Sequence, residues 1–319
     1  MMRFSCFLTG IVFSTLAAAQ SYPSKPIHLI VPLVPGGNQD IMARAVAEEV
    51  AKGLGQPIVV ENRPGQSAIL GTQVVKSAPA DGYTLLSVSV TFARVPTIVK
   101  SANYDPAADF SGVSLTCSIP QVLVVNPNVP AHSVKELIEL AKSKPGALSF
   151  GGSGNGSTGH VAAEEFMRMT GVKMLHVPYK GNAQALVDVM GGQITLMFDQ
   201  ISTSMPHMRS GKVRALAITT LKRSPLFPEL PTLDESGLKG FEDVTWNGIV
   251  APAGTPREVL ARLQAEVARV VDQPDFHKRW LERGIDTAAS ASPEEFSAYI
   301  RKEAQAFATL AREAGIKAD

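Results

Sequence analysis

Short apolar runs alternate with amphipathic helical patterns along most of the chain. Each run has the length of a β-strand and is bounded by Gly, Pro, Asn or Asp. These runs are 27–34, 58–61, 83–90, 121–125, 148–151, 174–178, 194–198, 213–219 and 248–251. Because strand and helix patterns take turns in this way, the sequence predicts an α/β fold built from βαβ units with largely parallel sheets.

Capping-box pairs mark the starts of several predicted helices. The pairs are Ser133 with Glu136, Thr255 with Glu258, and Ser292 with Glu295. In such a pair, two side chains satisfy backbone N–H groups that have no partner inside the helix. Pro256 and Pro293 are expected at the first helical position, where a missing N–H costs nothing.

The length of 319 residues favours two compact domains over one, because a single core stops growing below this size. We expect the runs 121–125 and 213–219 to carry the chain into a middle domain and back. The predicted division is a discontinuous first domain, 20–122 plus 223–319, and a second domain, 123–222.

Residues 1–19 have the pattern of a secretory signal peptide. Arg3 precedes an apolar stretch over 4–16, which is too short to span a bilayer, and three alanines then offer a cleavage point before Gln20. A retained N-terminal helix is the alternative. The signal predicts export to the periplasm.

Charge and cysteine content narrow the possible partners. Loss of residues 1–19 removes one Arg from the 30 basic residues and none of the 29 acidic ones, so the mature chain is formally neutral. A neutral surface argues against nucleic acid and anionic membranes as partners. Cys117 is then the single thiol, so no internal disulfide can form, and we expect a buried side chain.

A glycine-containing loop over 32–40 follows the first predicted strand and precedes a helix predicted over 41–52. Adjacent glycines at a strand end leave backbone N–H groups open to a ligand, and the following helix start adds a partial positive charge. Such a loop can hold an anion without an arginine. Asp40 suits the N-cap of this helix, with Arg44 one turn further on.

A second glycine-rich loop, 152–160, leads into a helix predicted over 161–169. It contains a literal G-x-G-x-x-G, but no acidic residue follows at the end of the next strand, over 176–180, to bind a ribose hydroxyl. A dinucleotide site is therefore not supported, and no other cofactor is expected.

An exported hydrolase using Ser157 is the alternative enzyme class. Asn155 breaks the G-x-S-x-G pattern, and His160 follows too closely to be the usual triad base, so we expect a packed or helix-end histidine. The histidines are scattered singly, which argues against a zinc site. The two loops together favour a non-enzymatic clamp that holds a carboxylate between two domains.

Ordered motifs across nearly the whole mature chain resemble the extracytoplasmic receptors of tripartite tricarboxylate transporters, also called Bug proteins. The motifs are YPSKPI at 22–27, PGG at 35–37 with Asp40 and Arg44, VENRPG at 60–65, ADGYTL at 80–85, VPYKG at 177–181, Asp188 with GGQ at 191–193, GKVRALA at 211–217, PT at 231–232 and APAGTP at 251–256.

The resemblance implies a periplasmic-binding-protein-like fold of the Venus-flytrap type (type II), with a ligand cleft between two domains. It implies capture of a small carboxylate and delivery to the membrane permease of the transporter; presentation of the ligand to a signalling sensor is the alternative. We expect a monomer. The implied ligand-binding residues are Pro35, Gly36, Gly37, Asn38, Ser67, Ala68, Ser89, Gly156, Ser157, Thr158 and Asp199.

Some of these positions leave the ligand chemistry open. Asp199 could pair with an amine or hydroxyl of the ligand, or could be a solvated acid at a strand end. Asn38 and Gln39 replace the small residues usual after the double glycine in this family. Arg94 either points inward, where it could meet a second carboxylate, or lies on the surface, where arginines are more common.

Overall fold

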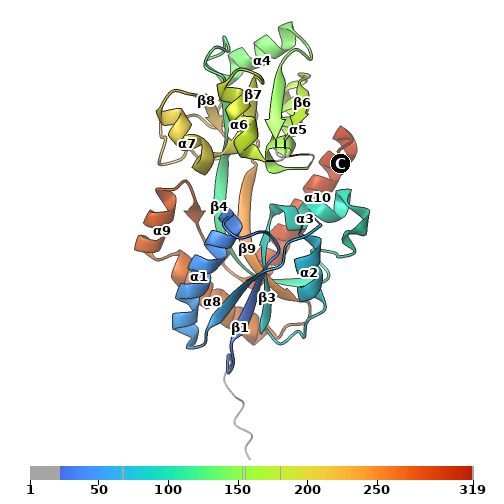
Figure 1. The fold of residues 1–319 in the computed structure, drawn as a ribbon, viewed down its shortest axis with the longest axis vertical. Coiled ribbons are helices and arrows are strands. Elements are labelled where there is room, and N and C mark those ends of the chain that lie inside the picture. Colours follow the sequence, from blue (N-terminus) through green and yellow to red (C-terminus); the bar gives the residue numbers. More distant parts are fainter. Residues whose placement is uncertain (1–21, 67, 153, 155, 180, 318–319) are drawn as a thin grey trace, which may run out of the picture.

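A computed structural model describes residues 22–317, except 67, 153, 155 and 180. Two lobes are joined by long neighbouring strands, β4 (Phe110–Val125) and β9 (Val244–Pro252) (Figure 1). The α/β class expected from the pattern is confirmed, but the expectation of largely parallel sheets is wrong, because the pairings of β4 and β9 are antiparallel. Within the described residues, no helix combines the length and hydrophobicity needed to cross a membrane.

The first lobe is a mixed sheet covered by helices on both faces. Its strands are β1 (Ile27–Val31), β2 (Ile58–Asn62), β3 (Thr84–Ser89), β9, the first part of β4, and β10 (Asp286–Thr287). Its helices are α1 (Asn38–Leu54), α2 (Ile69–Lys76), α3 (Val90–Ile98), the 3₁₀ turn η1 (Lys100–Ala102), α8 (Arg257–Val271), α9 (Pro274–Leu281) and α10 (Pro293–Ala314). One core packs α1 and α8 against the sheet, and another packs α3 and α10 against its opposite face.

The second lobe repeats this plan on the far end of β4. Its other strands are β5 (Ser149–Gly152), β6 (Leu175–Pro178), β7 (Leu196–Gln200) and β8 (Arg214–Ile218). Its helices are α4 (Val134–Ser143), α5 (Thr158–Thr170), α6 (Asn182–Met190) and α7 (Ile201–Arg209). Apolar residues at helical spacing supply part of its core, with Val134, Leu137 and Ala141 of α4 all buried.

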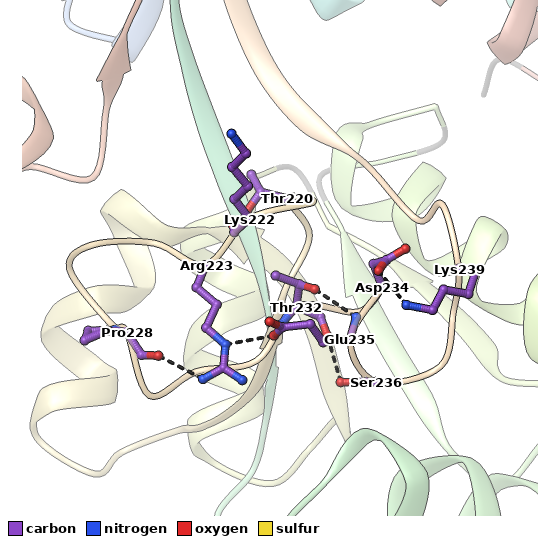
Figure 2. A network of polar contacts seen from close by, with 9 residues as sticks. All are labelled: Thr220, Lys222, Arg223, Pro228, Thr232, Asp234, Glu235, Ser236 and Lys239. Atoms are coloured by element: carbon purple, nitrogen blue, oxygen red, sulfur yellow. Dashed lines mark hydrogen bonds and ion pairs between the residues drawn. The ribbon is translucent and has the colours of Figure 1, made fainter.

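The segment between β8 and β9 packs on the second lobe. Phe227, Leu230, Leu233 and Phe241 are buried against its cores. Polar contacts tie the segment to itself. In Figure 2, Arg223 donates to Glu235 at 2.8 Å and to the Pro228 carbonyl oxygen at 2.9 Å, while Lys239 donates to Asp234 at 2.9 Å.

These contacts differ from the division expected at residues 222 and 223. The run 213–219, which we expected to carry the chain back, forms β8 inside the second lobe and pairs with β4. The return is made by β9, whose pairing with β4 runs from Phe110 opposite Pro252 to Pro120 opposite Val244. We therefore propose that the first domain resumes at β9.

Strand directions determine which edges of the two lobes meet. Strands β1, β2 and β3 are mutually parallel, and β3 and β4 both run antiparallel to β9, so β1–β3 point the same way as β4, toward the second lobe. In the second lobe, β5, β6 and β7 are parallel to one another and antiparallel to β4, so they point back toward the first lobe. The carboxyl ends of both strand sets therefore face each other.

The predicted helix caps are confirmed at two of the three sites. Ser133 and Ser292 accept the backbone N–H groups of Glu136 and Glu295, each at 3.2 Å. The third prediction is wrong: α8 begins at Arg257 with Pro256 as N-cap, and the Thr255 hydroxyl donates to the Pro252 carbonyl instead. That turn ends β9, and its own hydrogen bond competes with the cap.

Gly159 of α5 lets this helix approach β7 closely, which sets the position of the α5 N-terminus. A Cβ at this position would lie 2.4 Å from the carbonyl oxygen of Phe198. We expect Gly159→Ala to lower the free energy of unfolding by about 1–3 kcal/mol, although Ala is the better helix former. Urea denaturation measures the effect. Gly181→Ala is the control, because this glycine has an extended φ of 179° and open space around a Cβ; equal midpoints for both variants would contradict the packing argument.

Candidate functional site

Six helices begin at the facing edges of the two lobes. In the first lobe, α1, α2 and α3 follow the parallel strands β1, β2 and β3; in the second, α5, α6 and α7 follow β5, β6 and β7. The first turn of a helix carries N–H groups without intrahelical acceptors and a partial positive charge. Facing sets of helix starts form a site suited to an anion, with no cationic side chain required.

The first glycine loop begins α1 three residues earlier than predicted. Gly37 is the N-cap, and Pro35, Gly36 and Gly37 are exposed. Asp40 is therefore not the N-cap as expected. It lies in the first turn, where its carboxylate accepts the Gly36 N–H at 2.9 Å, so this N–H is already used within the loop. The expected pair with Arg44 is present, with Nε 3.1 Å from Asp40 Oδ1.

The starts of α2 and α3 carry two more of the predicted positions. Ala68 is the N-cap of α2 with φ of 73°, and Gln66 nearby has φ of 48°. Positive φ is costly for residues with a Cβ and is concentrated at functional sites. Ser89 is the N-cap of α3, and its hydroxyl lies 2.6 Å from that of Thr91. Ser67 lies outside the described residues.

The second glycine loop begins α5 at Thr158, with Ser157 as its N-cap. Ser157 Oγ accepts the His160 N–H at 3.4 Å. Gly156 is buried and donates its N–H to His160 Nδ1 at 3.0 Å, so this amide too is used within the loop. The half-buried Thr158 reaches across to Thr245 of β9, with 3.3 Å between hydroxyl oxygens.

His160 is packed, as expected. Its ring stacks on His176 at 4.2 Å between centroids and on Phe150 at 6.1 Å, and its Nε2 lies 3.4 Å from Glu164. Because Nδ1 accepts from Gly156 and Nε2 faces Glu164, neither ring nitrogen is directed at the Ser157 hydroxyl. This arrangement does not support a Ser157 nucleophile with His160 as its base.

Asp199, the residue before the last of β7, is a fully buried carboxylate and is not the solvated acid that we considered. It accepts from Asn182 at 2.8 Å, Thr203 at 2.5 Å and Ser204 at 2.7 Å. Burial raises the pKa of Asp199, while these hydrogen bonds act in the opposite direction. The carboxylate therefore ties together the starts of α6 and α7.

Asn38 and Gln200 connect the lobes directly. The Asn38 amide of α1 donates to Gln200 Oε1 at 2.7 Å, and Gln200 Nε2 lies 3.4 Å from the Thr245 hydroxyl. Sequence reasoning missed Gln200, Thr245 and Asn182. Gln200 and Asn182 were detectable as polar residues at the ends of strand-like runs, whereas Thr245 lies in a strand whose start was not recognised.

Arg94 is buried, which corrects the surface position that we favoured. Its side chain, 6% exposed, pairs with Asp243 at 3.2 Å and lies 4.0 Å from Glu303. Burial raises the pKa of Asp243 to about 6, against the opposing effect of Arg94. The pair lies at the beginning of β9 and not among the helix starts.

Two hollows of the described structure lie away from the facing edges. One of about 880 Å³ is on the outer side of the second lobe, lined by the start of α4, the end of α7 and β8. Another of about 490 Å³ lies between α5 and α10. Helix starts and strand directions, rather than hollow size, identify the candidate site. No group of three or more His, Cys, Asp or Glu among the described residues is placed to hold a metal.

Two α/β lobes with facing helix starts, joined by a pair of crossing strands, define a two-domain solute-binding protein. The family model described as tripartite tricarboxylate transporter family receptor matches residues 42–316. The chain belongs to this family. It is 35% identical to the protein BugT of Bordetella pertussis over 302 residues, which cover 94% of this chain and 92% of BugT.

Solved structures of related proteins share the fold. A Rhodopseudomonas palustris protein solved with adipate, Rpa4515, is 35% identical, with a TM-score of 0.79 over 93% of this chain and 100% of that one. MatC of the same organism, solved with malate, is 31% identical, with a TM-score of 0.74 over 91% and 99%. The expected two-domain binding-protein fold is confirmed.

Asp40 stabilises the first loop in its charged form. Burial raises its pKa, but hydrogen bonds from Gly36, Arg44 and Asn62 outweigh burial and hold the pKa below its ordinary value. We expect Asp40→Asn to lower the free energy of unfolding at pH 7 by about 1–2 kcal/mol, because hydrogen bonds to a charge are lost.

The difference in free energy of unfolding between Asp40→Asn and the unmodified protein should be fully present above the ordinary Asp pKa of about 3.9. It should shrink as the pH falls below that value toward the lowered pKa of Asp40 in the folded protein. Urea denaturation at pH 7, 5 and 3.5 measures it. Asp275→Asn, at an exposed acid in the first turn of α9, is the control. A difference that is constant over this pH range would contradict the role of the charge.

Proposed function

We propose that this protein is a periplasmic receptor that captures a small carboxylate between its two domains. The observation that carries the proposal is the meeting of six helix starts at the facing edges, three from each lobe. The ligand carboxylate binds to N–H groups of these first turns, as anions do at helix N-termini. Family membership and the adipate and malate of the solved relatives support a carboxylate ligand.

Hydrogen bonds within the two loops decide which backbone N–H groups we assign to the ligand. The N–H groups of Gly36 and Gly156 are occupied by Asp40 and His160. The ligand oxygens are therefore held by the amides that come next in each loop, those of Gly37 and Asn38 in the first and of Thr158 in the second. Pro35, Ala68, Ser89 and Ser157 shape the walls around them, together with Ser67.

Asp199 acts on the ligand indirectly in this proposal. Its carboxylate is fully engaged, and its hydrogen bond with Asn182 fixes the direction of that amide. A carboxylate only accepts, so the NH₂ group of Asn182 faces Asp199 and the Asn182 oxygen points elsewhere. Among the described residues this oxygen has no hydrogen-bond partner. This oxygen can accept from a ligand hydroxyl or amine.

The receptor works outside the cytoplasm and without chemistry on its ligand. Signal-peptide cleavage before Gln20 releases the mature monomer into the periplasm, and the loaded receptor delivers its ligand to the membrane permease of a tripartite tricarboxylate transporter. The family description supports this partner.

Gly37→Val tests the carboxylate site without disturbing the fold. Gly37 has φ of −77°, which any residue adopts, and a Cβ there meets no atom of the described residues within 4 Å, so the valine side chain fits in open space beside the loop. We expect the ligand-free melting temperature to stay within about 2 °C of the unmodified protein, while ligand-induced stabilisation is lost because the backbone can no longer be approached.

The measurement is a thermal-shift screen with citrate, malate, adipate, aspartate and benzoate. Gly37→Ala should give an intermediate loss. Lys142→Val, on the exposed side of α4 at the far end of the second lobe (Figure 1), is the control. Full stabilisation of the Gly37→Val protein by the same carboxylate would refute the first-loop site.

A further inference from the structure

The hydrogen bond between Asn38 and Gln200 joins side chains that are 162 positions apart and belong to different lobes. It continues through Gln200 to Thr245 at 3.4 Å and from Thr245 to Thr158 at 3.3 Å. The chain of contacts thus runs from the start of α1 to the start of α7, then to the crossing strand β9 and the start of α5. We call these four residues the inter-lobe latch.

The Asn38 side of the latch is held rigidly. Asn38 is the first residue of α1, and the two residues that follow it are each held by hydrogen bonds to other parts of the first lobe. Gln39, 5% exposed, donates to the Ser87 carbonyl oxygen at 2.8 Å, and Asp40 is bonded to Gly36 and Arg44. The backbone of Asn38 therefore cannot follow Gln200 if the lobes separate.

The Gln200 side is equally constrained. Gln200 is the N-cap of α7 and follows Asp199, whose buried carboxylate holds the starts of α6 and α7 together. Because the backbone is held in place at both Asn38 and Gln200, the 2.7 Å hydrogen bond between their side chains forms only when the two lobes approach each other. The contact therefore belongs to the closed arrangement.

We infer that Asn38 and Gln200 are positioning residues that stabilise the closed receptor and so lengthen the residence time of the bound carboxylate. This inference rests on the proposed function. A ligand bound between the lobes leaves only after they open, so a contact made solely in the closed arrangement slows release without changing the encounter. One neutral hydrogen bond shifts the closed-to-open ratio by about two- to tenfold.

Closure can be measured directly, without a ligand, by pulsed EPR distances. Lys52→Cys in the first lobe and Lys135→Cys in the second provide labelling sites, since these side chains are 61% and 84% exposed. Native Cys117 will not compete in a chain that lacks residues 1–19, because it is fully buried and burial raises its thiol pKa to about 12.

In the ligand-free protein, a short distance between the two labels reports the closed arrangement and a long distance reports the open one. We expect the ratio of the short-distance to the long-distance population to fall about two- to tenfold in Asn38→Ala and in Gln200→Ala. The double variant should match Gln200→Ala, because that single change already removes the contact with Asn38. Gln200→Glu keeps an oxygen that can accept from Asn38 and should retain the short distance. Ser202→Ala is the control, since the Ser202 hydroxyl on α7 has no hydrogen-bond partner in the described part of the chain. Equal distance distributions in all variants would overturn the latch.

Stopped-flow release of a carboxylate that binds in the thermal-shift screen supplies the functional readout. Asn38→Ala should speed release about two- to tenfold, with the association rate unchanged. Unchanged release would overturn the positioning role, and so would faster release with unchanged ligand-free distances, because a lost direct ligand contact also speeds release. If none of citrate, malate, adipate, aspartate and benzoate binds, the proposed function fails, while the ligand-free distances still decide the latch.

Discussion

The pairing of β4 with β9 is the constraint from which the rest of the structure follows. These antiparallel strands run side by side out of the first sheet, and β4 continues into the second. Since β1–β3 run with β4 and β5–β7 run against it, the carboxyl edges of the two sheets are forced to face each other. Every helix start that follows a parallel strand is then delivered to the same region.

In the proposed function, the facing helix starts are what attracts an anion without a cationic side chain. Isolated N–H groups need an acceptor, and each helix adds a partial positive charge at its first turn. No buried cation has to be desolvated to provide the attraction, which is costly in a protein interior. Arg94, the buried arginine considered for this role, is instead paired with Asp243 near the beginning of β9.

The two glycine loops are fixed by different side chains, and in both loops one backbone N–H group is hydrogen-bonded. An acid in the first turn of α1, Asp40, ties down Gly36, and an imidazole in the first turn of α5, His160, ties down Gly156. Each device uses one loop amide and so fixes the direction of the amides that follow. In the proposed function this preorganisation favours binding, because ordering flexible loops on binding would weaken affinity.

The sequence by itself determined the class of fold, the helix caps at Ser133 and Ser292, the two glycine loops and the family. These features depend on local patterns: hydrophobic period, turn residues and side chains that reach a few positions along the chain. The cap predicted at Thr255 is wrong because the Thr255 hydroxyl donates to the Pro252 carbonyl oxygen in the turn after β9. Residue spacing does not reveal this competing hydrogen bond.

Tertiary structure alone decided which strand carries the chain back, where residues 223–241 pack, and which side chains meet between the lobes. Asn38 and Gln200 are 162 positions apart, and nothing in either neighbourhood predicts their contact. Likewise, Asp199 could have faced solvent or ligand until the approach of α6 and α7 buried it. Such contacts depend on how whole elements pack, because pairing over long separations is set by the complete core and not by local propensity.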